Sequence, residues 1–258
     1  LHRASGEPRH LSLADRIVTD FWERDGNPRI MPVLRDRGPV SAIGRGKAYE
    51  MMSCFVGLLE YAQARRSHDL VDLVRAARDR IGDTMRHVTG GVSSGEWFLP
   101  PGQIPEHECI ETCVTFTWIQ LNLRLHDLCG DERSLELAEE AAWNQLLPAL
   151  GPDGSTWTYH LPITGPKRFA RRWLQGVEDR LPGPSLTCCH TNGQRGLALF
   201  PLHAFATGDD GAVALNFFLD SAGVVVVPRA GAVEVSQESS RADGSRIVVR
   251  LEAEREGA

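Results

Sequence analysis

Hydrophobic positions in the first two thirds of the chain recur at helical spacing. Between residues 70 and 85 they form one apolar stripe, made of Leu70, Leu73, Val74, Ala77, Ile81 and Met85. Residues 46–63 carry a broader apolar face, and residues 112–128 are apolar on nearly all sides, as in a helix buried on several sides. Further helices are expected at residues 134–147 and 190–206. Short helices joined by small loops predict a mainly α fold, such as a helical barrel or solenoid.

The pattern changes to that of strands after residue 208. Asp209-Asp210-Gly211 predicts a turn, and Asp243-Gly244 is typical of a hairpin turn. Runs of β-branched or alternating residues lie at 212–219, 223–227, 232–236 and 246–252. The sequence therefore predicts a domain boundary near residue 209, with a helical domain over residues 1–208 and an antiparallel sheet over residues 209–258.

Composition excludes several classes of protein. The chain has 258 residues and a net charge of −6, and this acidic balance argues against a nucleic-acid partner, which would require a basic surface. No apolar run approaches the roughly 18 residues of a membrane span, so no membrane partner is expected. The chain begins with Leu1 rather than Met. We therefore expect a piece of a longer protein, without the region that would carry a signal peptide.

The densest polar clusters lie at residues 106–113 and 187–190, and both contain cysteine. Thiolate, imidazole and carboxylate groups are the usual ligands of zinc. On a helix, Glu111 and Cys113 would point about 200° apart, so they can share one ion only just before or at a helix start. The adjacent Cys188 and Cys189 can reach one ion only from a turn, and residues 182–184 (Pro-Gly-Pro) indicate such an irregular approach. The alternative is that these cysteines are buried small hydrophobic residues.

The remaining candidates are weaker. Glu96 lies beside Trp97 and Phe98, and an apolar surrounding would raise its pKa and make it a general acid; the alternative is a glutamate on a surface loop. Cys54 and Cys129 are expected in the core, while Cys109 stays undecided, with packing favoured. Four histidines are expected to cap or satisfy helices, namely His68, His87, His126 and His203.

Several short motifs, read in order, resemble one known family. They are His87-Val88-Thr89-Gly90-Gly91, Gly95-Glu96-Trp97-Phe98, Glu111-Thr112-Cys113, Leu137-Ala138-Glu139, Trp143-Asn144, Thr158-Tyr159 and Cys188-Cys189. In order and approximate spacing, from about residue 46 to 210, they resemble the zinc-dependent β-L-arabinofuranosidases. These enzymes form glycoside hydrolase family 127 and its relatives, formerly domain of unknown function 1680.

This resemblance implies a fold and a mechanism. It implies the C-terminal part of an (α/α)6 barrel followed by the start of a β-sandwich domain. It also implies a retaining exo-glycosidase that releases terminal β-L-arabinofuranose, or a related sugar, from plant-derived glycans. Glu111, Cys113, Cys188 and Cys189 would hold Zn²⁺. Cys188 would be the nucleophile, Glu96 the acid and base, and Tyr159 a substrate contact.

The chain departs from the family pattern at three places. Gly46-Lys47-Ala48 replaces a common Gly-His-Ala, Leu186 replaces a histidine, and His190 replaces the proline that usually follows the two cysteines. Two other hypotheses therefore stay open: a catalytically silent carbohydrate-binding relative, and a helical protein with a structural zinc. Persistent zinc thiolates favour a reducing cytoplasm, and the sequence does not indicate an oligomeric state.

Overall fold

A computed structural model describes residues 1–103, 108–152, 154–165, 167, 173–174, 177–178, 188–228, 230–240 and 246–253. The chain divides into two compact units, Leu1–Leu197 and Ala198–Ala258, called here the helical unit and the sheet unit. This division falls inside the last helix, α9 (Cys188–His203). The domain boundary expected near residue 209 stays a prediction.

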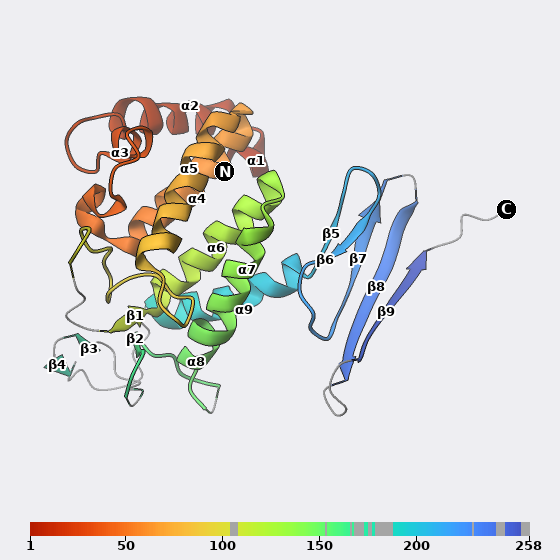
Figure 1. Cartoon of the computed structure of the whole chain (residues 1–258). Helices are drawn as coiled ribbons and strands as arrows, with labels where there is room; N and C mark the ends of the chain where they lie inside the picture. Colours follow the sequence, from red (N-terminus) through yellow and green to blue (C-terminus); the bar gives the residue numbers. More distant parts are fainter. Residues whose placement is uncertain are drawn as a thin grey trace. The chain divides into compact units, whose positions relative to one another are not determined.

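The helical unit is an array of antiparallel and crossing helices (Figure 1). Its helices are α1 (His2–Ser5), α2 (Pro8–Arg16), α3 (Ile30–Arg35), α4 (Ala48–Arg65), α5 (His68–Met85), α6 (Thr112–Cys129), α7 (Glu132–Ala141), α8 (Leu147–Ala149) and the first part of α9. Short helical turns occupy Ile17–Phe21, Val40–Ala42, Gly44–Gly46 and Ala142–Leu146. Short antiparallel pairs are formed by β1 (Cys109–Glu111) with β2 (His160–Pro162) and by β3 (Trp173–Leu174) with β4 (Val177–Glu178).

Helix α6 lies at the centre of this unit and packs against α4, α5 and α7. Its residues are buried on almost every side, as the continuous apolar run predicted; Trp118, for example, is fully buried. The apolar stripe of α5 likewise faces inward, with Val74, Ala77 and Ile81 buried. None of the described helices combines the length and the apolarity that crossing a membrane requires.

One prediction about packing is wrong, and one helix is less regular than expected. Residues 134–147 are helical, as predicted, but α7 passes at Ala142–Leu146 through a wider π-helical turn into α8. Cys129, expected in the core, is exposed. It is the last residue of α6, and Gly130 follows it in the left-handed conformation that ends the helix.

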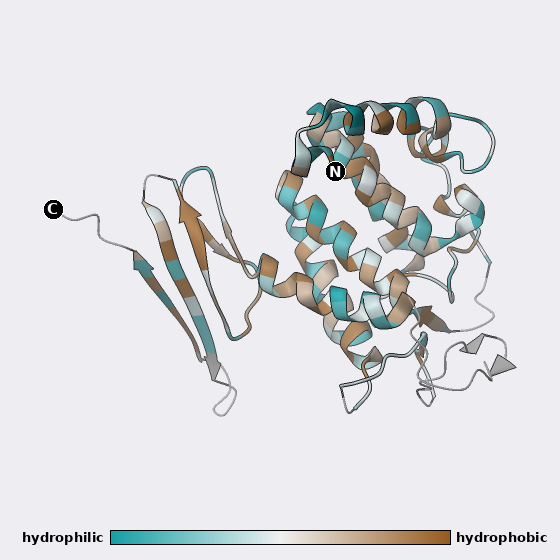
Figure 2. Ribbon diagram, turned by 180° about the vertical axis from the view of Figure 1, so that it is seen from behind, coloured by the Kyte–Doolittle hydropathy of each residue, from teal (hydrophilic) through white to brown (hydrophobic). Residues whose placement is uncertain are grey.

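The sheet unit contains β5 (Phe205–Thr207), β6 (Val213–Leu215), β7 (Ser221–Val227), β8 (Gly231–Ser240) and β9 (Arg246–Ala253). β5 pairs with β6, and β7, β8 and β9 form an antiparallel sheet in that order. β7 is hydrophobic over most of its length (Figure 2). The core of the sheet unit consists of Val227, Val233 and Val235, with Phe205, Val213, Leu215 and Val225 packed against them. The turn expected at Asp243-Gly244 lies outside the described residues.

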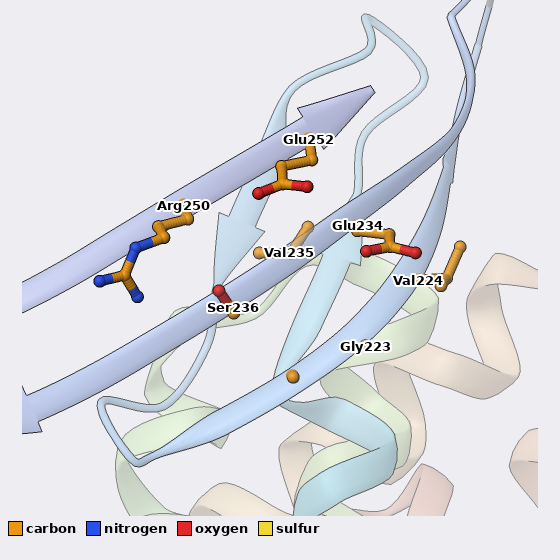
Figure 3. A pocket seen from close by; sticks show the side chains of 8 residues that line it. Gly223, Val224, Glu234, Val235, Ser236, Arg250 and Glu252 are labelled. Atoms are coloured by element: carbon orange, nitrogen blue, oxygen red, sulfur yellow. The ribbon is translucent and has the colours of Figure 1, made fainter. Parts of the chain in front are cut away.

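One face of this sheet is open and mixed in character (Figure 3). A shallow hollow of about 350 Å³ lies over it, with Val224, Glu234, Ser236, Arg250 and Glu252 among its lining residues. Glu234 faces Glu252 in the strand register, and Ser236 faces Arg250. Val224 is largely exposed. None of the described polar residues that line this hollow is buried.

Candidate active site

Two backbone hydrogen bonds hold Glu96 beside the start of α4. The amide of Ala48 donates to the carbonyl of Glu96 (2.9 Å), and the amide of Phe98 donates to the carbonyl of Gly46 (2.8 Å). Gly46 has φ of +78°, and a Cβ there would lie 2.8 Å from the carbonyl oxygen of Phe98. Only glycine permits this close approach. Gly46 therefore allows the backbone just before α4 to lie against the segment that carries Glu96.

The opposite edge of the same segment is bonded to β1. The amide of Gly95 donates to the carbonyl of Cys109 (2.7 Å), and the amide of Glu111 donates to the carbonyl of Gly95 (3.2 Å). The next residue, Thr112, donates its amide to the carbonyl of Tyr159 (3.0 Å). Three segments far apart in the sequence are thereby fixed side by side, and they carry Glu96, Glu111 and Tyr159.

The loop before Glu96 is anchored on α7, which explains why two of the motifs occur together. Gly90 has φ of +81°, and a Cβ at this position would lie 2.8 Å from Cγ of Glu140 and 2.9 Å from the amide nitrogen of Ala141. Arg86, at the start of the loop, forms an ion pair with Glu140 (2.7 Å). The Thr-Gly-Gly motif and the α7 motif are thus two sides of one packing contact.

Four ligand atoms gather where this frame meets α6 and α9. The carboxylate of Glu111 and the sulfurs of Cys113, Cys188 and Cys189 all lie within 4.8 Å of one another. The sulfurs of Cys113 and Cys189 are 3.3 Å apart, and the sulfur of Cys189 is 3.8 Å from Oε1 of Glu111. Tetrahedral ligands about 2.3 Å from a zinc ion lie about 3.8 Å from one another. The spacing of this cluster, called here the thiol cluster, therefore fits a metal ion.

Local structure explains how these side chains converge. Glu111 is the extended N-cap residue of α6, and Cys113 is the second residue of that helix, which is the position that the Glu-x-Cys spacing requires. Cys188 and Cys189 are the first residues of α9 rather than part of a turn. The Pro-Gly-Pro segment at 182–184 and Leu186 lie outside the described residues.

The thiol cluster is acidic, and three of its four members are buried while Cys188 is exposed. Burial, together with neighbouring negative charges, raises the pKa of Glu111 to about 8. Hydrogen bonds from Cys113 and Cys189 lower the pKa of Cys188, while the hydrogen bond to Cys188 raises the pKa of Cys113 and burial raises that of Cys189. Among the described residues, no basic side chain forms an ion pair with these four groups. Cys188, the most exposed of the three cysteines, is thus the one whose pKa is lowered.

Glu96 is buried rather than placed on a surface loop, with 4% of its area exposed. Its Oε2 forms an ion pair with Nζ of Lys47, and its Oε1 accepts a hydrogen bond from the hydroxyl of Tyr159 (3.0 Å). Burial acts to raise the pKa of Glu96, but the hydrogen bonds from Lys47 and Tyr159 outweigh it, so the net pKa is lowered. The expectation of a raised pKa is therefore wrong, because it left out Lys47.

Tyr159 connects Glu96 to the thiol cluster. Its hydroxyl donates a hydrogen bond to Glu96 (3.0 Å), and its carbonyl oxygen lies 3.7 Å from the sulfur of Cys189. Burial and the neighbouring carboxylates raise the pKa of Tyr159, so its hydroxyl stays protonated. The sulfur of Cys188 lies within 4.8 Å of that of Cys189. Tyr159 therefore contacts both Glu96 and the thiol cluster to which Cys188 belongs.

Sequence reasoning missed two contacts in this site. Lys47 was recognised only as a departure from a family pattern, and its role as the partner of Glu96 was not expected. Asn192 donates its side-chain amide to the sulfur of Cys113 (3.2 Å). Asn192 follows Cys188 by four residues, and this helical spacing is a signal that could have placed it on the same face of α9.

The other candidates lie elsewhere. Cys109 is buried, which fits the packing role, and Cys54 is partly buried. His87 and His203 bond to the carbonyls of Ser93 and Leu199, both at 2.8 Å. None of these residues is part of the thiol cluster.

The chain matches a family model described as the beta-L-arabinofuranosidase, GH127 catalytic domain, over residues 1–202. No curated protein sequence matches it. The mainly helical fold, with part of a helical barrel followed by a sheet domain, is that of solved GH127 structures, which confirms the expected fold class.

Three solved structures show this likeness, and the chain spans less than half the length of each. A GH127 beta-L-arabinofuranosidase from Geobacillus stearothermophilus T6 shares 17% identity at a TM-score of 0.75, covering 98% of this chain and 44% of its own. A glycoside hydrolase shares 19% at 0.75, covering 97% and 44%. A GH127 beta-arabinofuranosidase shares 19% at 0.71, covering 97% and 38%. With residues 1–202 matched by the catalytic-domain model, the chain belongs to the GH127 beta-L-arabinofuranosidase family.

Proposed function

We propose that this chain carries the catalytic centre of a retaining exo-glycosidase that releases terminal β-L-arabinofuranose or a related sugar. One observation carries the proposal: Tyr159 is hydrogen-bonded to the buried Glu96 through its hydroxyl and contacts Cys189 of the thiol cluster, which includes Cys188, through its carbonyl. A retaining glycosidase uses two such groups about 5 Å apart, one as nucleophile and one as acid and base. Glu96 and Cys188, which Tyr159 and the thiol cluster bring into one region, would be these two groups.

Zn²⁺ fits the thiol cluster by the chemistry of its donors. Three sulfurs and one carboxylate oxygen are a common ligand set for zinc, and their separations suit a tetrahedral ion. When bound, zinc supplies positive charge that keeps its thiol ligands deprotonated near neutral pH. Glu111, Cys113, Cys188 and Cys189 would hold it. The hydrogen bond from Asn192 to Cys113 would orient one of these ligands.

The chain's own residues would then divide the reaction into two steps. In the first, the thiolate of Cys188 attacks the anomeric carbon, the C–O bond to the leaving group breaks, and Glu96 gives its proton to the leaving oxygen. In the second, Glu96 removes a proton from water, and the resulting oxygen displaces the sulfur of Cys188. The anomeric carbon is inverted twice, so its configuration is retained. Tyr159 would contact the sugar between the two groups.

The family supplies the class of substrate. Two of the similar solved structures are described as beta-arabinofuranosidases and the third as a glycoside hydrolase. A glycan or oligosaccharide with a terminal arabinofuranose, as in plant material, is therefore the substrate that we propose for the whole protein. The thiol cluster also supports a reducing compartment such as the cytoplasm, because exposed thiolates oxidise elsewhere.

A second candidate is a catalytically silent protein that binds carbohydrate. One observation favours it: the ion pair with Lys47 keeps Glu96 ionised, and an ionised carboxylate has no proton to donate. The two candidates differ in turnover. Only the first predicts release of free arabinose.

Hydrolysis of a β-L-arabinofuranosyl disaccharide by the zinc-loaded full-length protein tests the proposal. We expect free arabinose from the unaltered protein and no measurable turnover from Cys188→Ala or Glu96→Ala. Cys129→Ala is the matched control, since this exposed cysteine lies outside the thiol cluster and its loss should leave turnover unchanged. Near-normal activity of either site variant would overturn the assignment of roles. Sugar binding without product would favour the silent relative.

A further inference from the structure

Lys47 occupies an unusual position for a lysine in this chain. It is one of only two lysines, and the other, Lys167, is exposed. About a third of the Lys47 side chain is exposed, and its ammonium group contacts the carboxylate of Glu96. The same nitrogen lies 4.3 Å from the centre of the Trp97 ring, close enough for a cation–π contact.

Backbone structure fixes both partners of this ammonium group. Lys47 forms an antiparallel bridge with Trp97, and the next residue, Ala48, donates its amide to the carbonyl of Glu96. The Lys47 side chain therefore leaves the backbone directly beside the two residues that it contacts. A long side chain on the surface loses conformational entropy when it forms an ion pair. For Lys47 this cost is smaller, because the Trp97 ring and the backbone bridge already restrict the side chain.

The ion pair completes a set of contacts that fixes the Glu96 carboxylate. Lys47 contacts Oε2, and Tyr159 donates to Oε1 at 3.0 Å. Each oxygen thus has a partner on a different side. A carboxylate held from two sides keeps one orientation, which is what proton transfer to a leaving oxygen demands.

We propose that Lys47 is a positioning residue for Glu96: it fixes the direction of the carboxylate beside Tyr159 and keeps a positive charge against it. This inference rests on the proposed function, since it concerns the acid and base of that reaction. Lys47 itself touches neither nucleophile nor thiol cluster in any described contact. Its effect on the reaction passes through Glu96.

The charges around Glu96 give this proposal a measurable consequence. Lys47, from the start of α4, and His160, from β2, favour the ionised carboxylate of Glu96, and Tyr159 donates a hydrogen bond to it. The charge of Glu96 in turn helps to raise the pKa of Glu111. General acid catalysis requires protonated Glu96, so activity falls as the pH rises through the pKa of Glu96. Because Lys47 lowers that pKa, its removal should move the alkaline limb of the pH profile to higher pH.

The test is the pH profile of kcat/KM for the zinc-loaded full-length protein on a β-L-arabinofuranosyl disaccharide. We expect Lys47→Met to shift the alkaline limb upward by about one pH unit, as expected when one opposite charge is removed. Lys47→Arg, which keeps the charge, should leave the limb within about 0.3 units of its original position. Lys167→Met is the matched control, because it removes an exposed lysine by the same substitution. It should also leave the alkaline limb at its original position.

A second substrate separates positioning from a general structural defect. A dinitrophenyl arabinofuranoside has a leaving group that departs without a proton, so Lys47→Met should slow the disaccharide at least tenfold more than this compound. Equal loss on both substrates, or an unmoved alkaline limb, would overturn the role of Lys47 while the proposed function stood. Absence of turnover by the unaltered protein on both substrates would overturn the proposed function and, with it, the role of Lys47.

Discussion

Two buried polar clusters lie along α6, and they differ in how their charges are balanced. The first surrounds Arg78, which is 1% exposed. Arg78 donates to Asn122 (2.8 Å) and Ser134 (2.7 Å) and forms ion pairs with Asp79 (3.0 Å) and Asp131. The single positive charge is thus surrounded by carboxylates and neutral acceptors. This cluster is complete with the residues that the chain supplies.

The thiol cluster, at the other end of α6, is not balanced in this way. Its four groups are all acids, and in the described part of the chain none of them forms an ion pair with a basic side chain. Removing a charge from water costs several kcal/mol unless a partner compensates it. The comparison leads us to expect that the Arg78 cluster stabilises the fold and that the thiol cluster, as proposed above, binds a cation. The following predictions test this difference.

The largest effect is expected for Cys189→Ala. This fully buried cysteine lies in the middle of the thiol cluster, so its loss removes one of four metal ligands. Metal affinity should fall by more than about 100-fold, which exceeds the loss seen when an indirect contact is removed. Zinc competition with a coloured chelator measures it. Cys109→Ala, a buried cysteine outside the cluster, should keep full affinity, and equal losses in the two variants would contradict the account.

Arg78→Met should affect stability and leave metal binding unchanged. The substitution leaves Asp131 without its buried partner, and breaking such a pair costs about 3–5 kcal/mol. Urea unfolding measures the free energy, and the zinc content of the folded protein should remain that of the unaltered chain. If zinc were lost together with stability, the two clusters would not be independent.

Metal removal should destabilise the protein by a smaller amount. A ligand present at 100 times its Kd stabilises the folded state by about 2.7 kcal/mol. We expect the melting temperature to fall after treatment with a chelator and to recover on addition of zinc. Cys189→Ala should show neither change. An equal response in that variant would place the stabilising ion somewhere other than the thiol cluster.

The smallest effect is expected for Asn192→Ala, which removes the hydrogen bond to the sulfur of Cys113. Because Asn192 orients a ligand without binding the ion, zinc affinity should fall by about tenfold. Arg195, which donates to Oδ1 of Asn192 at 2.9 Å, offers a comparison one step further away. Arg195→Met should have less effect than Asn192→Ala; the reverse order would contradict this arrangement.

The sequence predicts the helical elements well where burial alone determines them. The continuous apolar run of α6 and the stripe of α5 need no information from distant residues. Cys129 shows the limit of this reasoning: it follows an apolar segment, but the helix ends there, and its side chain lies in solvent. The hydrophobic pattern indicates which face of a helix is buried, but it does not indicate whether other elements pack over the last turn of that helix.

The site depends on distant contacts that spacing does not reveal. The Glu-x-Cys spacing predicted a helix start for Glu111 and Cys113, but it did not show that Cys188 and Cys189 lie against them. That grouping came from the family resemblance. The pKa of Glu96 was predicted in the wrong direction because its partner, Lys47, lies 49 residues away in the chain. The bridge between Lys47 and Trp97, with the hydrogen bonds of Ala48 to Glu96 and of Phe98 to Gly46, brings the ammonium group to the carboxylate.

X-ray absorption at the zinc edge, on the metal-loaded protein, tests the central claim most directly. The claim is that Glu111, Cys113, Cys188 and Cys189 bind one zinc ion. We predict one equivalent of zinc with three sulfur ligands at about 2.3 Å and one oxygen ligand at about 2.0–2.2 Å. In Cys189→Ala the sulfur count should fall or the zinc should be lost. A zinc ion surrounded by nitrogen and oxygen alone, or a protein that binds no zinc, would contradict the account.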